Sequence, residues 1–276
     1  MTSHPTITLT KHHALGNDFL VVFHPPVPVG DLPALARGLC DRRRGVGADG
    51  LLVAESAAGY AAQMVLYNAD GSRAEMSGNG IRCFAQALAM RRGERTAPDF
   101  ADQLIRTDAG DRLVTLQPAE ARDTILASVD MGGVGVLDEP AGWDTLECHH
   151  DRPVAHLSLG NPHSVVAVDD VDGVDLAALG SKLPQVNLEI VAPGAAPHEV
   201  RMRVHERGVG VTEACGTGAA ATAFAAAQWG LATPRDGKLT VVMDGGSATV
   251  TLDAPEPGRV TLTGPATYVA TIEVVI

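Results

Sequence analysis

Short segments in which apolar and polar residues alternate are spread along most of the chain, and this period of two predicts β-strands. Thr6–Leu9 and Glu199–Val204 show the alternation most clearly. Two longer segments, Gly80–Arg91 and Gly218–Trp229, are rich in apolar residues and lack proline and interior glycine, which predicts a long helix at each. Many strands with hairpin-like spacing and few helices indicate an α+β fold, in which mostly antiparallel sheet packs around a helix.

The same patterns predict the remaining elements. Shorter helices are expected at Asp31–Cys40 and Asp175–Leu179, and Lys11–Asn17 is expected to be a turn-rich connection. The other expected strands are Phe19–Phe23, Leu51–Ala54, Ala62–Tyr67, Gln103–Thr107, Arg112–Leu116, Thr124–Asp130, Ala155–Leu159, Ser164–Val168, Asn187–Val191, Leu239–Met243, Ala248–Leu252, Arg259–Leu262 and Ala270–Ile276.

Two short motifs occur twice, about half a chain length apart. Glu75-Met76-Ser77-Gly78-Asn79-Gly80 is echoed by Glu213-Ala214-Cys215-Gly216-Thr217-Gly218, 138 residues later in a chain of 276. Leu15-Gly16-Asn17 returns as Leu159-Gly160-Asn161, so both motifs keep their order within each half. The chain is therefore interpreted as a tandem duplication that forms two similar domains.

The repeated Gly-x-Gly lies where a long helix is predicted to begin. The first N–H groups of a helix have no partner within it, and together with the helix dipole they form a site for a carboxylate or phosphate. Cys215 lies at such a helix start, where a thiolate is stabilised, so we expect a lowered pKa for Cys215. Two such starts facing one substrate across a cleft suit inversion of a stereocentre, because one group removes a proton and the other supplies one.

Composition and charge exclude several functions. The formal net charge of −12 argues against nucleic acid and anionic membranes as partners. The N-terminus has no signal-peptide pattern, and no apolar run is long enough to cross a membrane, so a cytoplasmic location is expected. The four cysteines lack CxxC spacing and are interpreted as free thiols.

Two other motifs are discounted. Gly45–Gly50 fits the dinucleotide-binding pattern letter for letter, but an arginine run precedes it and a strand follows it, where that motif needs a strand and then a helix. His12-His13 and Cys148-His149-His150 suggest metal, but adjacent histidines on a strand point to opposite faces, and no third and fourth ligands lie at metal-site spacing. We therefore expect no cofactor and no metal.

Several segments, in this order, resemble the diaminopimelate epimerase family, and they extend over nearly the whole chain. They are Leu15-Gly16-Asn17-Asp18-Phe19, Arg43 to Gly50, Asn68-Ala69-Asp70-Gly71-Ser72, Glu75 to Phe84, Gly160-Asn161-Pro162-His163, Glu206-Arg207-Gly208-Val209-Gly210 and Ala214 to Gly218. The resemblance implies two pseudo-symmetric domains, residues 1–123 with 265–276 and residues 124–264, with the active site in the cleft between them. It also implies a homodimer.

The resemblance implies a reaction and a set of site residues. Members of this family convert L,L-diaminopimelate to the meso form, for lysine and peptidoglycan precursors, without pyridoxal phosphate and with two cysteines as acid and base. Cys215 matches one cysteine, and His163 and Glu206 match groups that assist the two thiols. The substrate contacts implied are Asn17, Asn68, Gly78, Asn79, Asn161, Asn187, Glu206, Arg207, Gly216 and Thr217.

The chain departs from the family pattern at Ser77, where the family has its other cysteine. Because a hydroxyl is a much weaker acid than a thiol, Ser77 is a poor base at neutral pH. Three interpretations follow: an engineered serine that stalls the enzyme, a natural variant whose hydroxyl relays a proton with the help of His163, or a different reaction. For the third, the alternatives are a single-thiol isomerase or dehydratase of an imino acid such as hydroxyproline, and a non-catalytic amino-acid-binding protein.

Overall fold

The computed structural model describes residues 6–25, 27–94 and 100–275, which form two compact units. Unit 1 comprises the chain up to Val129 and from Pro265 onwards, and unit 2 comprises Asp130–Gly264. The boundary lies inside a strand, β8 (Thr124–Gly133), some residues after the expected junction at 123/124. Residues 1–5 of the expected first domain, and Ile276 of the expected last strand, lie outside the described residues.

Unit 1 is a sheet whose strand pairings return to their starting point. Its elements are β1 (Thr6–Ala14), β2 (Asn17–Phe23), a 3-10 turn (Val29–Asp31), α1 (Leu32–Cys40), β3 (Gly50–Glu55), β4 (Ala62–Asn68), β5 (Arg73–Ala74), α2 (Gly78–Arg91), β6 (Gln103–Thr107), β7 (Gly110–Pro118) and β8. The pairs β2–β3 and β4–β6 are parallel, and β1–β2, β3–β4, β6–β7 and β7–β8 are antiparallel. The last strand, β17 (Arg259–Val275), pairs with both β1 and β8 and so completes the circuit.

Unit 2 repeats this connectivity. Its elements are β9 (Gly135–Val136), a 3-10 turn (Trp143–Leu146), β10 (Val154–Ser158), β11 (Pro162–Ala167), α3 (Leu176–Gly180), β12 (Asn187–Pro193), β13 (Glu199–Glu206), β14 (Gly210–Thr212), α4 (Gly216–Gln228), β15 (Lys238–Met243), β16 (Gly246–Leu252) and the first part of β17. The parallel pairs are β11–β12 and β13–β15, at the positions of β2–β3 and β4–β6. This shared connectivity is what a duplicated sequence predicts.

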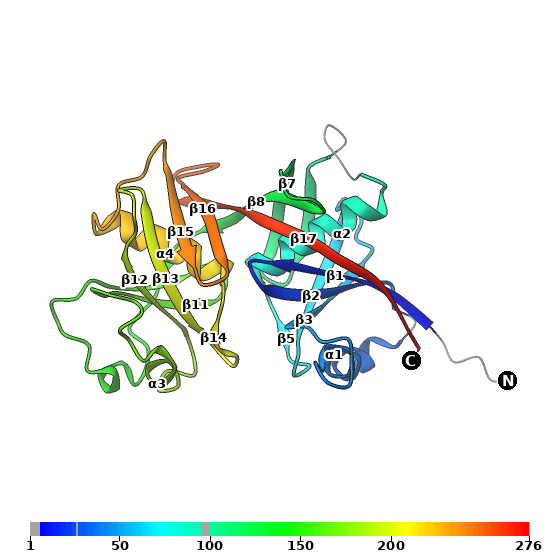
Figure 1. Ribbon diagram of the computed structural model, residues 1–276, viewed down its shortest axis with the longest axis horizontal. Helices are drawn as coiled ribbons and strands as arrows, with labels where there is room; N and C mark the ends of the chain where they lie inside the picture. Colours follow the sequence, from blue (N-terminus) through cyan, green and yellow to red (C-terminus); the bar gives the residue numbers. More distant parts are fainter. Residues whose placement is uncertain (1–5, 26, 95–99, 276) are drawn as a thin grey trace. The chain divides into compact units, whose positions relative to one another are not determined.

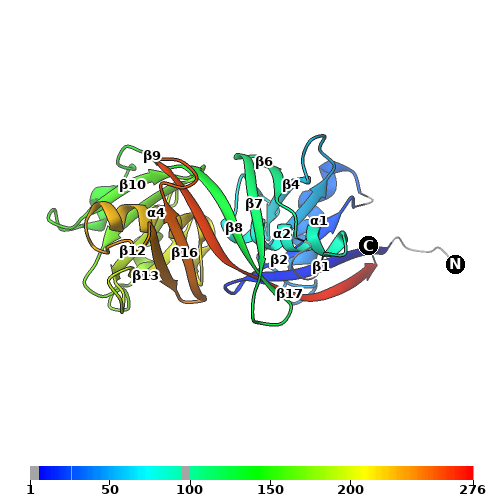
Figure 2. The ribbon, with the colours of Figure 1, turned by 90° about the horizontal axis from the view of Figure 1, so that it is seen from above.

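One long helix is buried within the strands of each unit. Figure 1 shows α2 among the strands of unit 1, with α1 outside them, and Figure 2 shows α4 among β10, β12, β13 and β16 of unit 2. Most of α2 is inaccessible to solvent, including the side chains of Ile81, Arg82 and Phe84. In α4 the buried positions are mostly alanine, which lets the surrounding strands approach the helix axis closely. The predicted α+β fold, two pseudo-symmetric units each with sheet around a central helix, is therefore confirmed.

Three predicted elements need correction. Strand β1 runs on to Ala14, so most of the expected turn-rich segment is strand that pairs with β2. Both long helices begin two residues earlier than predicted, at Gly78 and Gly216. The two strands expected near the C-terminus are one strand, β17, that passes through Pro265. Within the described ranges, no helix is both long and apolar enough to cross a membrane.

Candidate active site

Ser77 and Cys215 occupy the same position in the two units, as the N-cap residues of α2 and α4. Both have extended backbone angles, φ −139° and ψ 120° for Ser77, φ −129° and ψ 116° for Cys215. The N–H of Gly80 donates to Ser77 Oγ at 2.9 Å, and the N–H of Gly218 donates to Cys215 Sγ at 3.4 Å. Each side-chain oxygen or sulfur therefore accepts from one N–H group that has no partner within its helix.

In both units the second helical residue is hydrogen-bonded to the asparagine of the Leu-Gly-Asn motif. In unit 1, Nδ2 of Asn79 donates to Oδ1 of Asn17 at 3.2 Å. In unit 2, Nδ2 of Asn161 donates to Oγ1 of Thr217 at 3.3 Å. The preceding glycine has φ +88° at Gly16 and +91° at Gly160, a conformation that glycine adopts without strain. The two repeated motifs thus meet in each unit.

The helix start of unit 1 also contains a buried cation. Arg82 has no solvent exposure, and it donates to the carbonyl of Gly78 at 3.0 Å and to Oδ1 of Asn79 at 2.8 Å. Burial lowers the pKa of its guanidinium to about 10. Among the described residues no carboxylate pairs with Arg82, so its positive charge adds to that of the helix start.

The helix start of unit 2 is surrounded by buried acidic groups instead. Sγ of Cys215 lies 3.4 Å from Oγ1 of Thr217, which accepts a hydrogen bond from Asn161. Oδ1 of Asn161 in turn lies 3.0 Å from Nε2 of His163. Nδ1 of His163 lies 2.6 Å from Oε1 of Glu189, and both side chains have no solvent exposure. A continuous chain of polar contacts therefore runs from Cys215 to Glu189.

Cys215 does not have the lowered pKa that its helix start predicted, so that expectation was wrong. Burial, followed by the negative charges of Glu206 and Glu189, raises the pKa of the Cys215 thiol well above its usual value. Burial also raises the pKa of Glu206, although hydrogen bonds with Thr212 and Cys215 act in the opposite direction. The neutral thiol is accordingly the favoured state of Cys215.

Three expected substrate contacts lie at the end of a strand or in a turn. Oδ1 of Asn187 accepts from the N–H of Arg207 at 2.9 Å, while its Nδ2 donates to the carbonyl of Pro162, so Asn187 joins the turn after β13 to β11. The Arg207 side chain is exposed. Asn68 ends β4 and donates to Oγ of Ser72 at 3.0 Å, within the turn that follows.

Glu189 was not among the expected site residues. It is the one charged residue in β12, whose other residues up to Ala192 are buried and otherwise mostly apolar. Burying a carboxylate without a partner is costly, so a glutamate within an apolar strand indicates that a buried partner is present. This feature of the sequence could have identified Glu189. The partner could not be identified there, because His163 lies 26 residues earlier in the neighbouring strand.

The discounted histidine pair has a different geometry from the one expected. His149 and His150 lie in a turn rather than a strand, their rings stack at 4.6 Å, and Asp151 lies beside both. Ligand atoms of these three residues lie within 4.8 Å of one another, but all three side chains are exposed. Within the described ranges, no hydrogen bond or ion pair connects this group to the helix starts.

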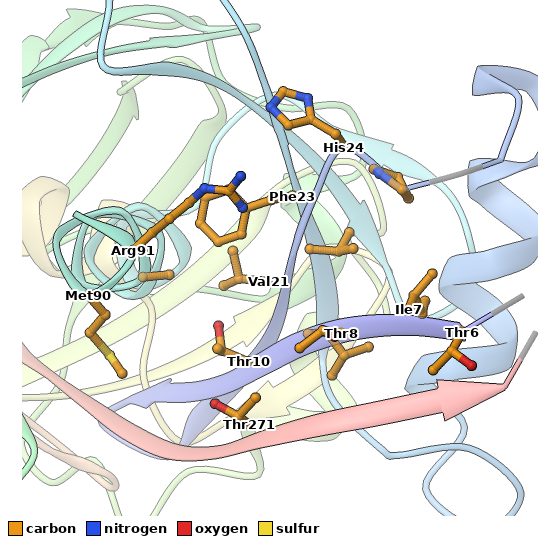
Figure 3. A pocket seen from close by; sticks show the side chains of 14 residues that line it. Thr6, Ile7, Thr8, Thr10, Val21, Phe23, His24, Met90, Arg91 and Thr271 are labelled. Carbon is orange, nitrogen blue, oxygen red and sulfur yellow. The ribbon is translucent and has the colours of Figure 1, made fainter. Parts of the chain in front are cut away.

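A surface hollow of about 570 Å³ lies at the far end of α2 (Figure 3). It is lined by β1, by residues 21–25 and by the end of α2, where the Arg91 guanidinium stacks on the Phe23 ring at 4.4 Å. Ser77 precedes the other end of this helix, roughly 20 Å away at 1.5 Å per residue. The hollow is therefore separate from the candidate active site.

Solved structures with this architecture include epimerases. A Bacillus anthracis phenazine biosynthesis protein of the PhzF family aligns with a TM-score of 0.75 and 18% identity, over 99% of this chain and 100% of that one. A hydroxyproline epimerase from Agrobacterium vitis aligns with a TM-score of 0.72 and 15% identity, over 98% and 93%. At these identities the likeness defines the class of fold: a duplicated α+β fold that epimerases use.

Sequence similarity is more specific. The family model described as diaminopimelate epimerase matches residues 9–137 and 156–269. Proteins named diaminopimelate epimerase from Acidiphilium cryptum and Streptomyces coelicolor are each 39% identical, over 94% and 96% of this chain and 93% and 94% of their own lengths. The chain belongs to the diaminopimelate epimerase family.

Proposed function

We propose that this protein interconverts L,L- and meso-diaminopimelate by moving a proton on and off one Cα, without a metal or an organic cofactor. The observation that carries the proposal is the matched pair of helix starts, each with a hydroxyl or thiol as its N-cap. The N–H groups at the two helix starts, Gly78-Asn79 and Gly216-Thr217, suit the substrate carboxylate, whose charge grows as the Cα proton leaves. Arg207 and the asparagines would bind the distal amino-acid end.

Cys215 and Glu206 supply the base on one face of the substrate. Because the neutral thiol is favoured, Cys215 gives its own proton to Glu206, whose negative charge acts on the thiol, as it takes the proton from Cα. The raised pKa of Glu206 makes it a better proton acceptor than an ordinary carboxylate.

Ser77 serves the other face as a relay. Its hydroxyl donates a proton to Cα while Oγ receives one from Nε2 of His163, so no free serine alkoxide forms. In the reverse direction the same two protons move back along the same path. Both helix starts would act on a single substrate molecule. The protein would be a homodimer, as the family resemblance implies, and would act in the cytoplasm.

The test is to incubate the protein with L,L- and with meso-diaminopimelate in heavy water, following inversion and deuterium at Cα together. We expect both, and a rise in kcat of at least about tenfold in Ser77→Cys, because a thiol donates a proton far more readily than a hydroxyl. Exchange without inversion would refute the relay and leave one working base. Turnover of an imino acid such as hydroxyproline, with none of diaminopimelate, would refute the substrate.

A further inference from the structure

The loop at residues 45–50, which fits a dinucleotide-binding pattern, closes the end of α1 instead. The N–H groups of residues 46–48 donate to the carbonyls of Leu39 and Cys40, the last two residues of α1, at 2.9 to 3.1 Å. An added Cβ at Gly45 would lie 2.7 Å from the carbonyl oxygen of Leu39, so a larger residue would displace the helix end. These N–H groups are therefore used within the fold and cannot bind a phosphate.

The closed loop places Asp49 against Asn17, the first residue of β2. Oδ2 of Asp49 accepts from Nδ2 of Asn17 at 2.7 Å and from the N–H of Asp18 at 3.0 Å. Oδ1 of Asp49 accepts from Nη2 of Arg42 at 2.8 Å. A backbone N–H and a guanidinium can only donate, so both oxygens of Asp49 are acceptors, and Asn17 must face Asp49 with its amide nitrogen.

The hydrogen bonds continue in one direction to the start of α2. Since Asn17 directs its nitrogen to Asp49, its Oδ1 accepts from Nδ2 of Asn79 at 3.2 Å. Oδ1 of Asn79 accepts in turn from Nη2 of Arg82 at 2.8 Å. The chain of bonds has an arginine, which only donates, at one end and a carboxylate, which only accepts, at the other, so both asparagine amides have a single orientation.

In unit 2 an apolar residue takes the place of Asp49, and the matching asparagine is oriented the other way. By the register of β11–β12 against that of β2–β3, Val186 has the position of Asp49. Asn161, which matches Asn17, directs its nitrogen to the helix start and donates to Oγ1 of Thr217 at 3.3 Å. The shared backbone therefore allows both orientations, and the carboxylate of Asp49 accounts for the one in unit 1.

We propose that Asp49 is a positioning residue for substrate binding, which fixes the orientation of the Asn17 and Asn79 amides at the helix start of unit 1. This rests on the proposed function, in which that helix start and the asparagines contact the substrate. Amides that are oriented in advance lose no further freedom when the substrate binds, so affinity is higher. Without Asp49 both amides can reverse, and only a fraction of the molecules have the orientation that binds substrate.

The first test needs no substrate. The asparagines of the chain are Asn17, Asn68, Asn79, Asn161 and Asn187, so labelling with ¹⁵N-asparagine gives few side-chain amide signals, each assigned by substitution. In Asp49→Asn an amide nitrogen faces either Arg42 or Asn17, so the chain of bonds cannot keep its direction. Apart from adding its own amide signals, Asp49→Asn should shift the signals of Asn17 and of Asn79, and leave those of Asn161 unchanged.

Asn17→Ala shows whether Asn17 transmits this change. In that background the Asn79 signals should no longer respond to Asp49→Asn, because Asn79 is linked to Asp49 through Asn17. A response of Asn79 that persists without Asn17, or no response in the presence of Asn17, would overturn the proposal.

The second test is kinetic. Asp49→Asn should raise KM for diaminopimelate about tenfold and leave kcat within about threefold, because Asp49 prepares a binding site and donates no proton. In the Asn17→Ala background the same substitution should change KM by less than about twofold. Asp108→Asn is the matched control, since it removes a carboxylate of unit 1 that Arg73 binds at 2.6 and 2.8 Å, and it should keep the wild-type KM.

Asn17→Asp keeps Asp49 in place and decides the question if Asp49→Asn does not fold. Two carboxylates would then face each other where the Asn17 amide nitrogen now lies 2.7 Å from Oδ2 of Asp49. Asn17→Asp should therefore melt roughly 5 °C below Asn17→Ala at pH 7. Equal melting temperatures would show that Asp49 does not require a donor at position 17, and would overturn the proposal.

The outcomes separate the two proposals. A wild-type protein that does not act on diaminopimelate refutes the proposed function, while the amide signals and melting temperatures still test Asp49. An unchanged KM in a folded Asp49→Asn variant refutes the role of Asp49 alone.

Discussion

Replacing Gly218 by alanine tests the packing around the Glu189–His163 pair. Gly218 is the third residue of α4, and an added Cβ would lie 2.6 Å from Oε1 of Glu189 and 3.3 Å from Sγ of Cys215. The carboxylate cannot move aside freely, because it is buried and hydrogen-bonded to His163. The new methyl group must therefore separate Glu189 from His163 or displace the helix start.

The expected magnitude follows from two opposing contributions. Alanine is favoured over glycine in a helix by about 1 kcal/mol. Overpacking the interior and leaving a buried carboxyl group without its hydrogen-bond partner together cost about 3–5 kcal/mol. Gly218→Ala should therefore lose about 2–4 kcal/mol of unfolding free energy, which corresponds to a drop in melting temperature of roughly 5–15 °C.

Gly80→Ala is the matched control, because Gly80 has the equivalent position in α2. Its added Cβ would lie 3.1 Å from Cβ and 3.2 Å from Oγ of Ser77, and 3.4 Å from Cδ2 of Leu52, tight contacts that a shift of a few tenths of an ångström relieves. We expect its stability within about 1 kcal/mol of the wild type. Urea and thermal unfolding followed by circular dichroism would compare the variants. If Gly218→Ala were as stable as Gly80→Ala, the pair would not be the rigid, buried unit described.

Two further predictions concern pH. Burial, then Glu206 and Glu189, raise the pKa of Cys215, so its alkylation by iodoacetamide should be slow at pH 7 and should still accelerate above pH 9. Glu206→Gln should shift this pH profile to lower pH. The measurement is peptide mass spectrometry, and an alkylation rate that reaches a plateau below pH 8 in the wild type would contradict the prediction. Burial lowers the pKa of His12 from 6.5 to about 4, so the unfolded chain binds a proton at a higher pH than the folded protein. The free energy of unfolding should therefore fall by about 3 kcal/mol as the pH drops from 6.5 to about 4. His12→Gln should lack this loss in urea unfolding at pH 7 and pH 4, and equal losses in both proteins would refute the assignment.

The repeated motifs were the part of the site that the sequence could predict. Spacing alone indicated that Leu-Gly-Asn and Gly-x-Gly belong together in each half, and the structure joins Asn17 to Asn79 and Asn161 to Thr217. Local chemistry sufficed here, because helix starts and glycine turns depend on a few neighbouring residues.

Contacts between residues that lie far apart in the chain could not be predicted from the sequence. Burial, followed by Glu206 and Glu189 on two other strands, raises the pKa of Cys215, so the helix start alone gave the wrong direction. Similarly, Gly264-Pro265 reads as a break between strands, yet β17 continues. Proline is tolerated there because it falls between Thr263, which pairs with β16, and Thr267, which pairs with β1.

The two helix starts share a backbone but have opposite buried charges. In unit 1 the fifth residue of the helix is Arg82, a buried cation, and in unit 2 it is Ala220. In unit 2 the strand behind the helix contributes Glu189, where unit 1 has Leu52. Buried groups of opposite charge give the two helix starts different proton affinities, so groups of unequal acidity serve the two faces of the substrate. Buried charge is an effective way to create that difference, because charge acts strongly in a low-dielectric interior and leaves the backbone hydrogen bonds unchanged. On this reasoning the replacement of a thiol at Ser77 extends an asymmetry that the buried residues of both units had already established.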